Sequence, residues 1–231
     1  MTAAESPSDG RRPWLLGIDT ATTRVVVAAG AVDGTPLGAT TWEAGRTHGE
    51  QLLPAIGRLT GEANLRRSRI RGVIVGTGPG AFTGLRVGLA TAKALAHELR
   101  VPIAGISTAE ALLEASGAGQ SALLLLPAGP NDRTLTRRGG PPALLAAGTE
   151  PDRTPGETLI AVDLVGRAPD DAIARGEQAR AGFAAALLRL GAERLSRTDG
   201  DDLARLVPEY VSLPRGVARE TGEVAWSRDP R

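Results

Sequence analysis

The sequence predicts an α/β fold with a mixed sheet, and two observations lead to this prediction. Short apolar runs alternate with segments of helical periodicity over residues 14–115, which is the order expected of an α/β lobe. The first two runs, residues 14–19 and 25–29, are separated only by a polar turn. They therefore predict neighbouring strands of a meander, with residues 38–42 as its third strand.

The most regular helical pattern covers residues 82–99, where leucine and alanine recur at intervals of three and four residues. Such a stripe indicates an amphipathic helix. A similar stripe over residues 48–59 predicts a helix with Pro54 in its first turn or at a kink. The remaining elements predicted here are strands over residues 70–75 and 101–106 and a helix over residues 108–115.

Beyond residue 116 the pattern weakens and predicts a smaller, loop-rich second lobe. Proline and glycine are frequent as far as residue 170, and the apolar runs are short. These runs cover residues 122–126 and 159–165, and residues 179–190 predict a helix. We expect a disordered tail over residues 1–12, a first lobe over 13–116, a second lobe over 117–207 and a return segment with a tail over 208–231.

The composition is that of an ordinary globular protein, with 42% hydrophobic and 23% charged residues. The absence of cysteine excludes disulfides and thiol nucleophiles. The apolar runs are much shorter than the ~20 residues that span a bilayer, and the first dozen residues contain no apolar export signal. We therefore expect a soluble, cytoplasmic protein.

The net charge of +1 gives no general attraction to nucleic acid, but one local cluster is strongly basic. It consists of Arg66, Arg67, Arg69 and Arg71. Contact with RNA is one interpretation of this cluster, and a solvated loop or helix end is the other.

Several enzyme classes are excluded by scarce residues. The only lysine, Lys93, follows Ala92, whereas a Walker A loop requires a glycine at that place. Ser107 lies between a predicted strand and a predicted helix, but both histidines precede it, which excludes the serine hydrolase order. We predict that Ser107 caps the helix that follows, and we predict no metal site.

The most suggestive polar segment contains Asp19, Thr20 and Thr22, and it begins at the end of the first predicted strand. A carboxylate at a strand end, followed by hydroxyls and amides, occurs near nucleotide phosphates and magnesium in the actin-like ATPase and sugar-kinase fold. The segment is therefore either a vestigial phosphate loop or a turn satisfied by its own hydroxyls.

Four segments resemble the TsaB family, formerly called YeaZ, in the same order and at the same spacing. The similarity covers about the first 115 residues, and Pro208 and Tyr210 resemble a later family segment. The second lobe diverges, because residues 126–133 replace the usual Asp-Ala-Arg-type segment. The four segments are residues 17–22 (GIDTAT), 48–54 (HGEQLLP), 78–88 (GPGAFTGLRVG) and 103–109 (IAGISTA).

This resemblance implies an actin-like (ribonuclease H-like) two-lobe fold with mixed sheets. It also implies a non-catalytic subunit that forms a heterodimer with TsaD, a paralogous enzyme, during addition of threonylcarbamoyl to adenosine 37 of tRNA. A TsaE-type ATPase joins the pair in that family. The resemblance implies that ATP and magnesium are used by the complex and that the chain contacts tRNA only through the complex. No cofactor is assigned to the chain itself, and binding of a nucleotide at Asp19 is left open. A homodimer of the chain alone is kept as an alternative.

The TsaD paralogue carries a His-x-x-x-His metal motif just after the strand that corresponds to residues 103–106. The corresponding positions here are Thr108 and Leu112. Leucine cannot ligate a metal, and threonine is a poor ligand. The resemblance therefore implies a helper and not the enzyme.

The predicted helix over residues 82–99 has one nearly smooth flank, because Gly84, Gly88 and Ala92 follow at intervals of four. Either close packing within the lobe or a partner helix would explain this flank. We predict a TsaD-facing surface formed by Leu52, Ile56, Leu85, Gly88 and Ala92, which Gly88→Arg would disrupt. The rival hypotheses are an independent ATPase or small-molecule kinase that uses Asp19, Thr20 and Thr22, and a homodimeric scaffold.

Overall fold

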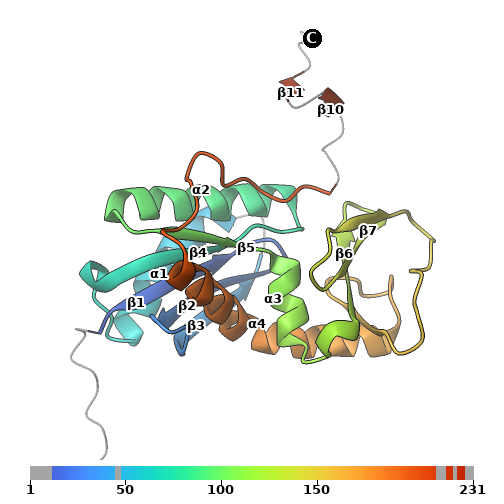
Figure 1. The fold of residues 1–231 in the computed structure, drawn as a ribbon, viewed down its shortest axis with the longest axis horizontal. Coiled ribbons are helices and arrows are strands. Elements are labelled where there is room, and N and C mark those ends of the chain that lie inside the picture. The colour runs from blue at the N-terminus through green and yellow to red at the C-terminus, as the bar shows by residue number, and fades with distance from the viewer. Residues whose placement is uncertain (1–11, 45–47, 212–216, 221–222, 227–231) are drawn as a thin grey trace, which may run out of the picture.

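The computed structural model describes residues 12–44, 48–211, 217–220 and 223–226. Within these residues the chain forms a five-stranded and a four-stranded sheet, each mixed, with helices packed against them (Figure 1). A short hairpin follows near the C-terminus, made of β10 (Val217–Glu220) and β11 (Glu223–Trp226). The predicted α/β fold class with mixed sheets is confirmed.

The five-stranded sheet has the order β3-β2-β1-β4-β5. Its first three strands form the predicted antiparallel meander, and β4 and β5 run parallel to β1. Every residue of β1 is buried, as expected of a central strand covered on both faces. The strands are β1 (Trp14–Asp19), β2 (Arg24–Ala31), β3 (Pro36–Glu43), β4 (Ile70–Gly76) and β5 (Ile103–Ile106).

Alternate residues of β1 face two different cores, because successive side chains point to opposite faces of a strand. Leu16 packs with α1 (His48–Glu62) and α2 (Phe82–Leu99) on one face. Leu15 packs with α3 (Thr108–Ala115) and α4 (Asp170–Arg197) on the other face. The first sheet is therefore the middle layer of three.

The four-stranded sheet has the order β8-β7-β6-β9, with β6 and β9 parallel. Leu123 and Leu125 of β6 pack in a small core of this lobe, whereas Leu124 and Leu126 pack in the same core as α3 and α4. Helix α4 contacts both sheets, so the residue ranges expected for the two lobes stay a prediction. The strands are β6 (Ala122–Ala128), β7 (Asp132–Arg137), β8 (Ala143–Leu145) and β9 (Thr158–Ala161).

The chain returns to the first sheet after α4 as an irregular strap, residues 198–211. The amide of Asp201 donates to the carbonyl of Ile103 in β5 at 2.7 Å, and the amide of Glu209 donates to the carbonyl of Thr77 at 2.7 Å. Because β5 ends the sheet, the strap covers hydrogen-bonding groups that an edge strand would otherwise present.

The structure contains two strands that were not predicted, β7 and β8. It also corrects one helix boundary, because α4 begins at Asp170 instead of residue 179. Helix α2 has the predicted bounds. Among the described helices, none has the length and apolarity required to cross a membrane.

Candidate functional site

The carboxyl group of Asp19 lies at the end of β1 and is held by the chain itself. Its Oδ1 accepts a hydrogen bond from the amide of Ala21 at 2.9 Å, and its Oδ2 accepts one from the hydroxyl of Thr108 at 2.6 Å. The Thr108 hydroxyl in turn accepts from the amide of Gly78 at 3.1 Å. Asp19 is only 1% exposed, so both carboxyl oxygens face protein and not solvent.

Burial raises the pKa of Asp19 to about 6, and the hydrogen bonds from Thr108 and Ala21 oppose this rise. Desolvation dominates because it disfavours the charged form of a carboxyl group. There is also no room for a larger neighbour, since a Cβ added at Gly76 would lie 1.7 Å from Oδ2 of Asp19. The glycine is therefore required by the close approach of this carboxyl group.

Thr20 fills the smooth flank of α2. Its hydroxyl donates to the carbonyl of Gly84 at 2.7 Å, and a Cβ added at Gly88 would lie 2.1 Å from that hydroxyl oxygen. A Cβ added at Gly84 would lie equally close, 2.1 Å from the carbonyl oxygen of Thr20. Of the two explanations for these glycines, close packing within the lobe therefore accounts for Gly84 and Gly88.

Thr22 stabilises the β1–β2 turn, and Thr23 joins this turn to the second lobe. The Thr22 hydroxyl donates to the carbonyl of Arg24 at 3.0 Å, which closes the turn locally. The amide of Thr23 donates to Oδ2 of Asp163 at 2.8 Å, and its hydroxyl donates to Oδ1. Asp163 also forms an ion pair with Arg180, and both side chains are less than 10% exposed, at 6% and 8%. These contacts fasten the β1–β2 turn to the second lobe.

Charged side chains of both signs surround Arg180 at this junction. Burial lowers the pKa of the Arg180 guanidinium, and the like charge of Arg24 lowers it further. Glu177 compensates both cations, with oxygen atoms 3.2 Å from Arg180 and 3.7 Å from Arg24. The space between Thr22, Arg24 and Arg180 is about 10 Å³, which is too small for a nucleotide.

Sequence reasoning missed Asp163 and Arg180. A usable signal was present, because residues 159–163 (LIAVD) repeat the pattern of residues 15–19 (LLGID), an apolar strand that leads to an aspartate. Nothing local in the sequence pointed to Arg180, which reaches the junction from α4. Ser107 was predicted correctly as a cap, since its Oγ accepts from the amide of Glu110 at 3.4 Å.

The five residues predicted for a partner surface are mostly interior. Leu52, Leu85 and Ala92 are at most 1% exposed, Gly88 is buried against Thr20, and Ile56 is half-buried. Buried side chains cannot meet a partner directly, and Gly88→Arg would disrupt the chain's own packing. A partner surface on α1 and α2 stays a prediction, and it has to be formed by their exposed residues.

The positions that correspond to the metal motif do not fit a metal ion. The hydroxyl of Thr108 donates to Asp19. Leu112 is 1% exposed and packs in the core shared by α3 and α4. The described part of the chain contains no group of three or more His, Asp or Glu side chains with the spacing of a metal site. Thr108 acts here as a structural hydrogen-bond donor.

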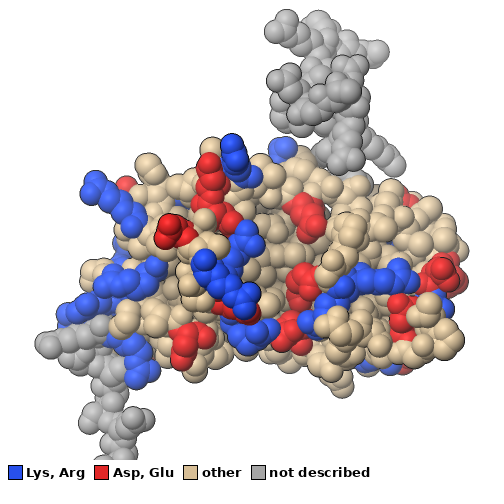
Figure 2. All heavy atoms as spheres, in the orientation of Figure 1, with Lys and Arg blue, Asp and Glu red and all other residues tan. Residues whose placement is uncertain are grey.

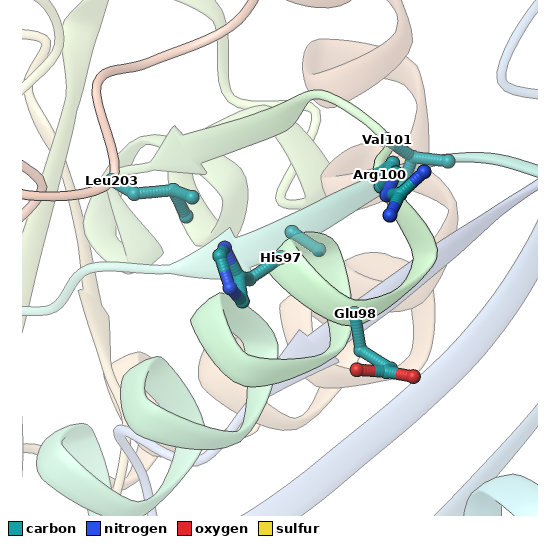
Figure 3. A pocket seen from close by; sticks show the side chains of 6 residues that line it. His97, Glu98, Arg100, Val101 and Leu203 are labelled. Carbon is teal, nitrogen blue, oxygen red and sulfur yellow. The ribbon is translucent and has the colours of Figure 1, made fainter.

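A shallow hollow of about 490 Å³ lies away from Asp19, at the end of α2 (Figure 3). His97 and Glu98 project from the last turn of α2, and Leu203 comes from the strap. The hollow brings together no pair of side chains arranged for acid–base or nucleophilic chemistry. None of the residues predicted for a site lines it.

Comparison with known proteins identifies the family. Residues 38–166 match the family model described as "TsaD: tRNA N6-adenosine threonylcarbamoyltransferase". The chain belongs to this family. The match runs from β3 to the loop after β9, so both sheets of this TsaD-family chain contribute to it.

The resemblance to TsaB within this family is confirmed. TsaB of Bacillus subtilis is 33% identical over 67 residues, which cover 29% of this chain and 29% of that protein. An uncharacterized protein of Mycobacterium tuberculosis is 40% identical over 101 residues, which cover 42% of this chain and 47% of that protein. The matched part of this TsaD-family chain thus spans less than half of the length of these curated relatives.

Among solved structures, YeaZ from Pseudomonas aeruginosa has a TM-score of 0.68 at 23% identity. The superposition covers 86% of this TsaD-family chain and 99% of YeaZ. At this level of identity the likeness establishes the fold.

Proposed function

We propose that the chain is a non-catalytic subunit of the machinery that places threonylcarbamoyl on adenosine 37 of tRNA, where it binds and supports a TsaD-type catalytic subunit. One observation carries the proposal. Thr108 and Leu112, which the resemblance aligns with the metal motif, are both engaged in the interior of the chain. A chain that cannot hold the metal at this place would serve the reaction through a partner.

The closed loop at Asp19 also favours a helper over an independent ATPase. Asp19 and Thr20 are 1% and 2% exposed, and Asp163 joins the neighbouring Thr23 across the two lobes. A nucleotide could reach these groups only if the loop left α2 and the junction opened. In this proposal ATP and magnesium are consumed by the complex, with a TsaE-type ATPase as the third component.

The exposed faces of α1 and α2 are our candidate for the surface that binds TsaD. The two helices lie side by side on one face of the first sheet (Figure 1). Leu53 is 58% exposed on α1, and a Cβ added at Gly57 or Gly61 would touch nothing within 4 Å. An exposed leucine beside a smooth helix surface suits close approach of a partner helix.

Reconstitution of tRNA modification tests the function. Purified TsaD-type and TsaE-type subunits, threonylcarbamoyl adenylate, ATP, magnesium and unmodified tRNA would be combined with and without the chain, and modified adenosine would be measured by mass spectrometry. We expect modification only when both the chain and the TsaD-type subunit are present. Modification by the chain alone, or full activity without it, would overturn the proposal.

The binding surface is tested by Leu53→Arg in co-purification with the TsaD-type subunit. We expect loss of the heterodimer, because a buried unpaired charge at an interface is strongly unfavourable. Leu144→Arg is a matched control, since Leu144 is similarly exposed at 52% but lies on β8. Retained binding by Leu53→Arg, or equal loss in both variants, would refute this surface. Light scattering of the chain alone and with the partner separates the heterodimer from a homodimeric scaffold.

A further inference from the structure

Arginines from two separate segments of the chain gather at one edge of the first sheet. Strands β1, β4 and β5 are parallel, so their N-terminal ends lie at the same edge. One group of arginines immediately precedes or begins β4, and another arginine lies shortly before β5. We call these residues the arginine edge: Arg66, Arg67, Arg69, Arg71 and Arg100.

The backbone under the arginine edge is held firmly. The indole nitrogen of Trp14, a fully buried residue, donates to the carbonyl of Arg66 at 3.0 Å. The amide of Arg69 donates to the same carbonyl at 2.9 Å, which closes a short helical turn. The charged groups therefore stand on an ordered scaffold, which reduces the entropy that binding must overcome.

These guanidinium groups lack carboxylate partners within the described part of the chain. Several arginines elsewhere are paired with carboxylates, such as Arg137 with Glu157 at 3.0 Å and Arg138 with Glu114 at 2.7 Å. At the arginine edge the side chain of Arg71 makes only a 3.4 Å contact with the carbonyl of Ile70. Figure 2 shows blue side chains crowded at the left end of the molecule, beside the start of β1. An uncompensated cluster of this kind attracts anions.

The surroundings of the arginine edge favour phosphates over a protein surface. Interfaces between proteins usually have an apolar centre, and arginine, although enriched at interfaces, surrounds or joins such a centre. Of the five large apolar side chains that are exposed in the described residues, only Val32, in the turn after β2, is near this edge. Contacts with a phosphate backbone need cationic groups and no apolar anchor, and the planar guanidinium binds phosphate in a two-pronged manner.

We propose that the arginine edge binds the phosphate backbone of RNA; the choice of RNA among polyanions rests on the proposed function in tRNA modification. Arg100 also lines the hollow shown in Figure 3, so the edge borders a concave surface. This surface is distinct from the exposed faces of α1 and α2 proposed for the TsaD-type subunit. The chain would thus touch RNA directly while its partner performs the chemistry.

Fluorescence anisotropy with a labelled tRNA transcript and the purified full chain tests the proposal over a range of salt concentrations. The plot of log affinity against log salt has a negative slope. In Arg67→Gln/Arg71→Gln we expect the magnitude of this slope to decrease by about 2, one for each phosphate that the variant no longer neutralises. Affinity at low salt should fall on the order of tenfold for each of these phosphates. Circular dichroism of the variant verifies that the fold is retained.

The matched control is Arg153→Gln/Arg205→Gln, which removes the same charge from exposed positions in the loop between β8 and β9 and in the strap. We expect this variant to bind tRNA like the unchanged chain. The proposal fails if no tRNA binding is detected at about 20 mM salt, where phosphate contacts are strongest, or if the two double variants lose affinity equally. It also fails if polyglutamate or phosphatidylserine vesicles bind the arginine edge as tightly as tRNA does.

This outcome is separable from that of the proposed function. RNA binding is measured on the chain alone, whereas the proposed function is measured by partner binding and reconstitution. A chain that binds the TsaD-type subunit but shows no arginine-dependent affinity for tRNA would refute only the arginine edge. A chain with arginine-dependent tRNA affinity but no effect in reconstitution would refute only the helper function.

Discussion

The hydroxyl of Thr108 donates a 2.6 Å hydrogen bond to the carboxyl group of Asp19, which lies 89 residues earlier in the chain. This contact joins the start of α3 to the end of β1 in the middle of the first lobe. The Thr108 hydroxyl also accepts from the amide of Gly78, so one side chain satisfies two buried groups. Thr108 therefore holds the β1–β2 turn and the loop after β4 together.

Replacement of Thr108 by valine should therefore destabilise the chain. Valine has a similar shape but cannot bond to Asp19 or Gly78, and each unsatisfied buried polar group costs about 1–3 kcal/mol. We expect a lower midpoint in urea unfolding, with Thr108→Ser retaining most of the stability because its hydroxyl remains. Equal stability of the valine variant and the unchanged chain would contradict this role of Thr108.

Asp19 should make the stability of the chain depend on pH between about pH 4 and pH 6. Its pKa is about 6 in the folded chain, against an ordinary value of 3.8. The folded state therefore retains a proton that the unfolded state has already lost, and the free energy of unfolding falls as the pH rises through this window. The loss amounts to about 3 kcal/mol, since one pKa unit corresponds to about 1.4 kcal/mol.

The Asp19→Asn variant isolates this contribution, because asparagine stays neutral at every pH used. Urea unfolding of both proteins from pH 4 to pH 7 should show that their difference in stability shifts in favour of asparagine as the pH rises. A difference that is constant over the whole range would show that Asp19 has an ordinary pKa.

Two glycine-to-alanine replacements should change the stability of the chain in opposite directions. A methyl group at Gly88 would collide with the Thr20 hydroxyl at 2.1 Å, whereas one at Gly57 in α1 would meet nothing within 4 Å. We expect Gly88→Ala to destabilise the chain by about 1–3 kcal/mol through overpacking. Gly57→Ala should stabilise it by up to about 1 kcal/mol, because alanine has the higher helix propensity. Thermal unfolding of both variants measures the contrast, and a stabilising Gly88→Ala would rule out the packing of Thr20 on α2.

The ion pair between Asp163 and Arg180 should be strongly coupled. Removal of one member leaves a buried charge, and such losses reach about 3 kcal/mol or more. We expect Arg180→Met to be markedly destabilising, and the double variant with Asp163→Asn to lose less than the sum of the two single variants. A double-mutant cycle in urea measures the coupling. Additive losses would mean that the two side chains do not interact.

The sequence predicted the first lobe far better than the second, for a physical reason. In α2 the apolar stripe and the burial pattern coincide, so the helix was predicted with its observed bounds. In β7 the buried residues include Arg133, Thr134 and Thr136, so a strand that is buried through polar side chains gave no apolar alternation. The first turns of α4 are polar apart from Ala172, Ile173 and Ala174, and its start was therefore placed too late.

The contacts of Asp19, Thr20 and Thr22 could not be predicted from the local sequence, and their role as a vestigial phosphate loop stays a prediction. The three residues lie where β1 ends and the turn to β2 follows, as their adjacency in the sequence requires. Asp19 bonds to Thr108 and Thr20 bonds to Gly84, whereas Thr22 bonds to nearby Arg24. The adjacent Thr23 bonds to Asp163, and no local pattern specifies contacts over such sequence separations. The smooth flank of α2 left two interpretations open, and only the position of Thr20 decides between them.

Helix α4 runs without interruption for 28 residues and contacts both sheets. A helix of that length measures about 42 Å at 1.5 Å per residue, and bending it sharply would break its own hydrogen bonds. The helix fixes the two sheets relative to each other, because neither sheet can move without losing its contacts with α4. In the docking role proposed for the chain, such stiffness would present a partner with a surface already in its final shape.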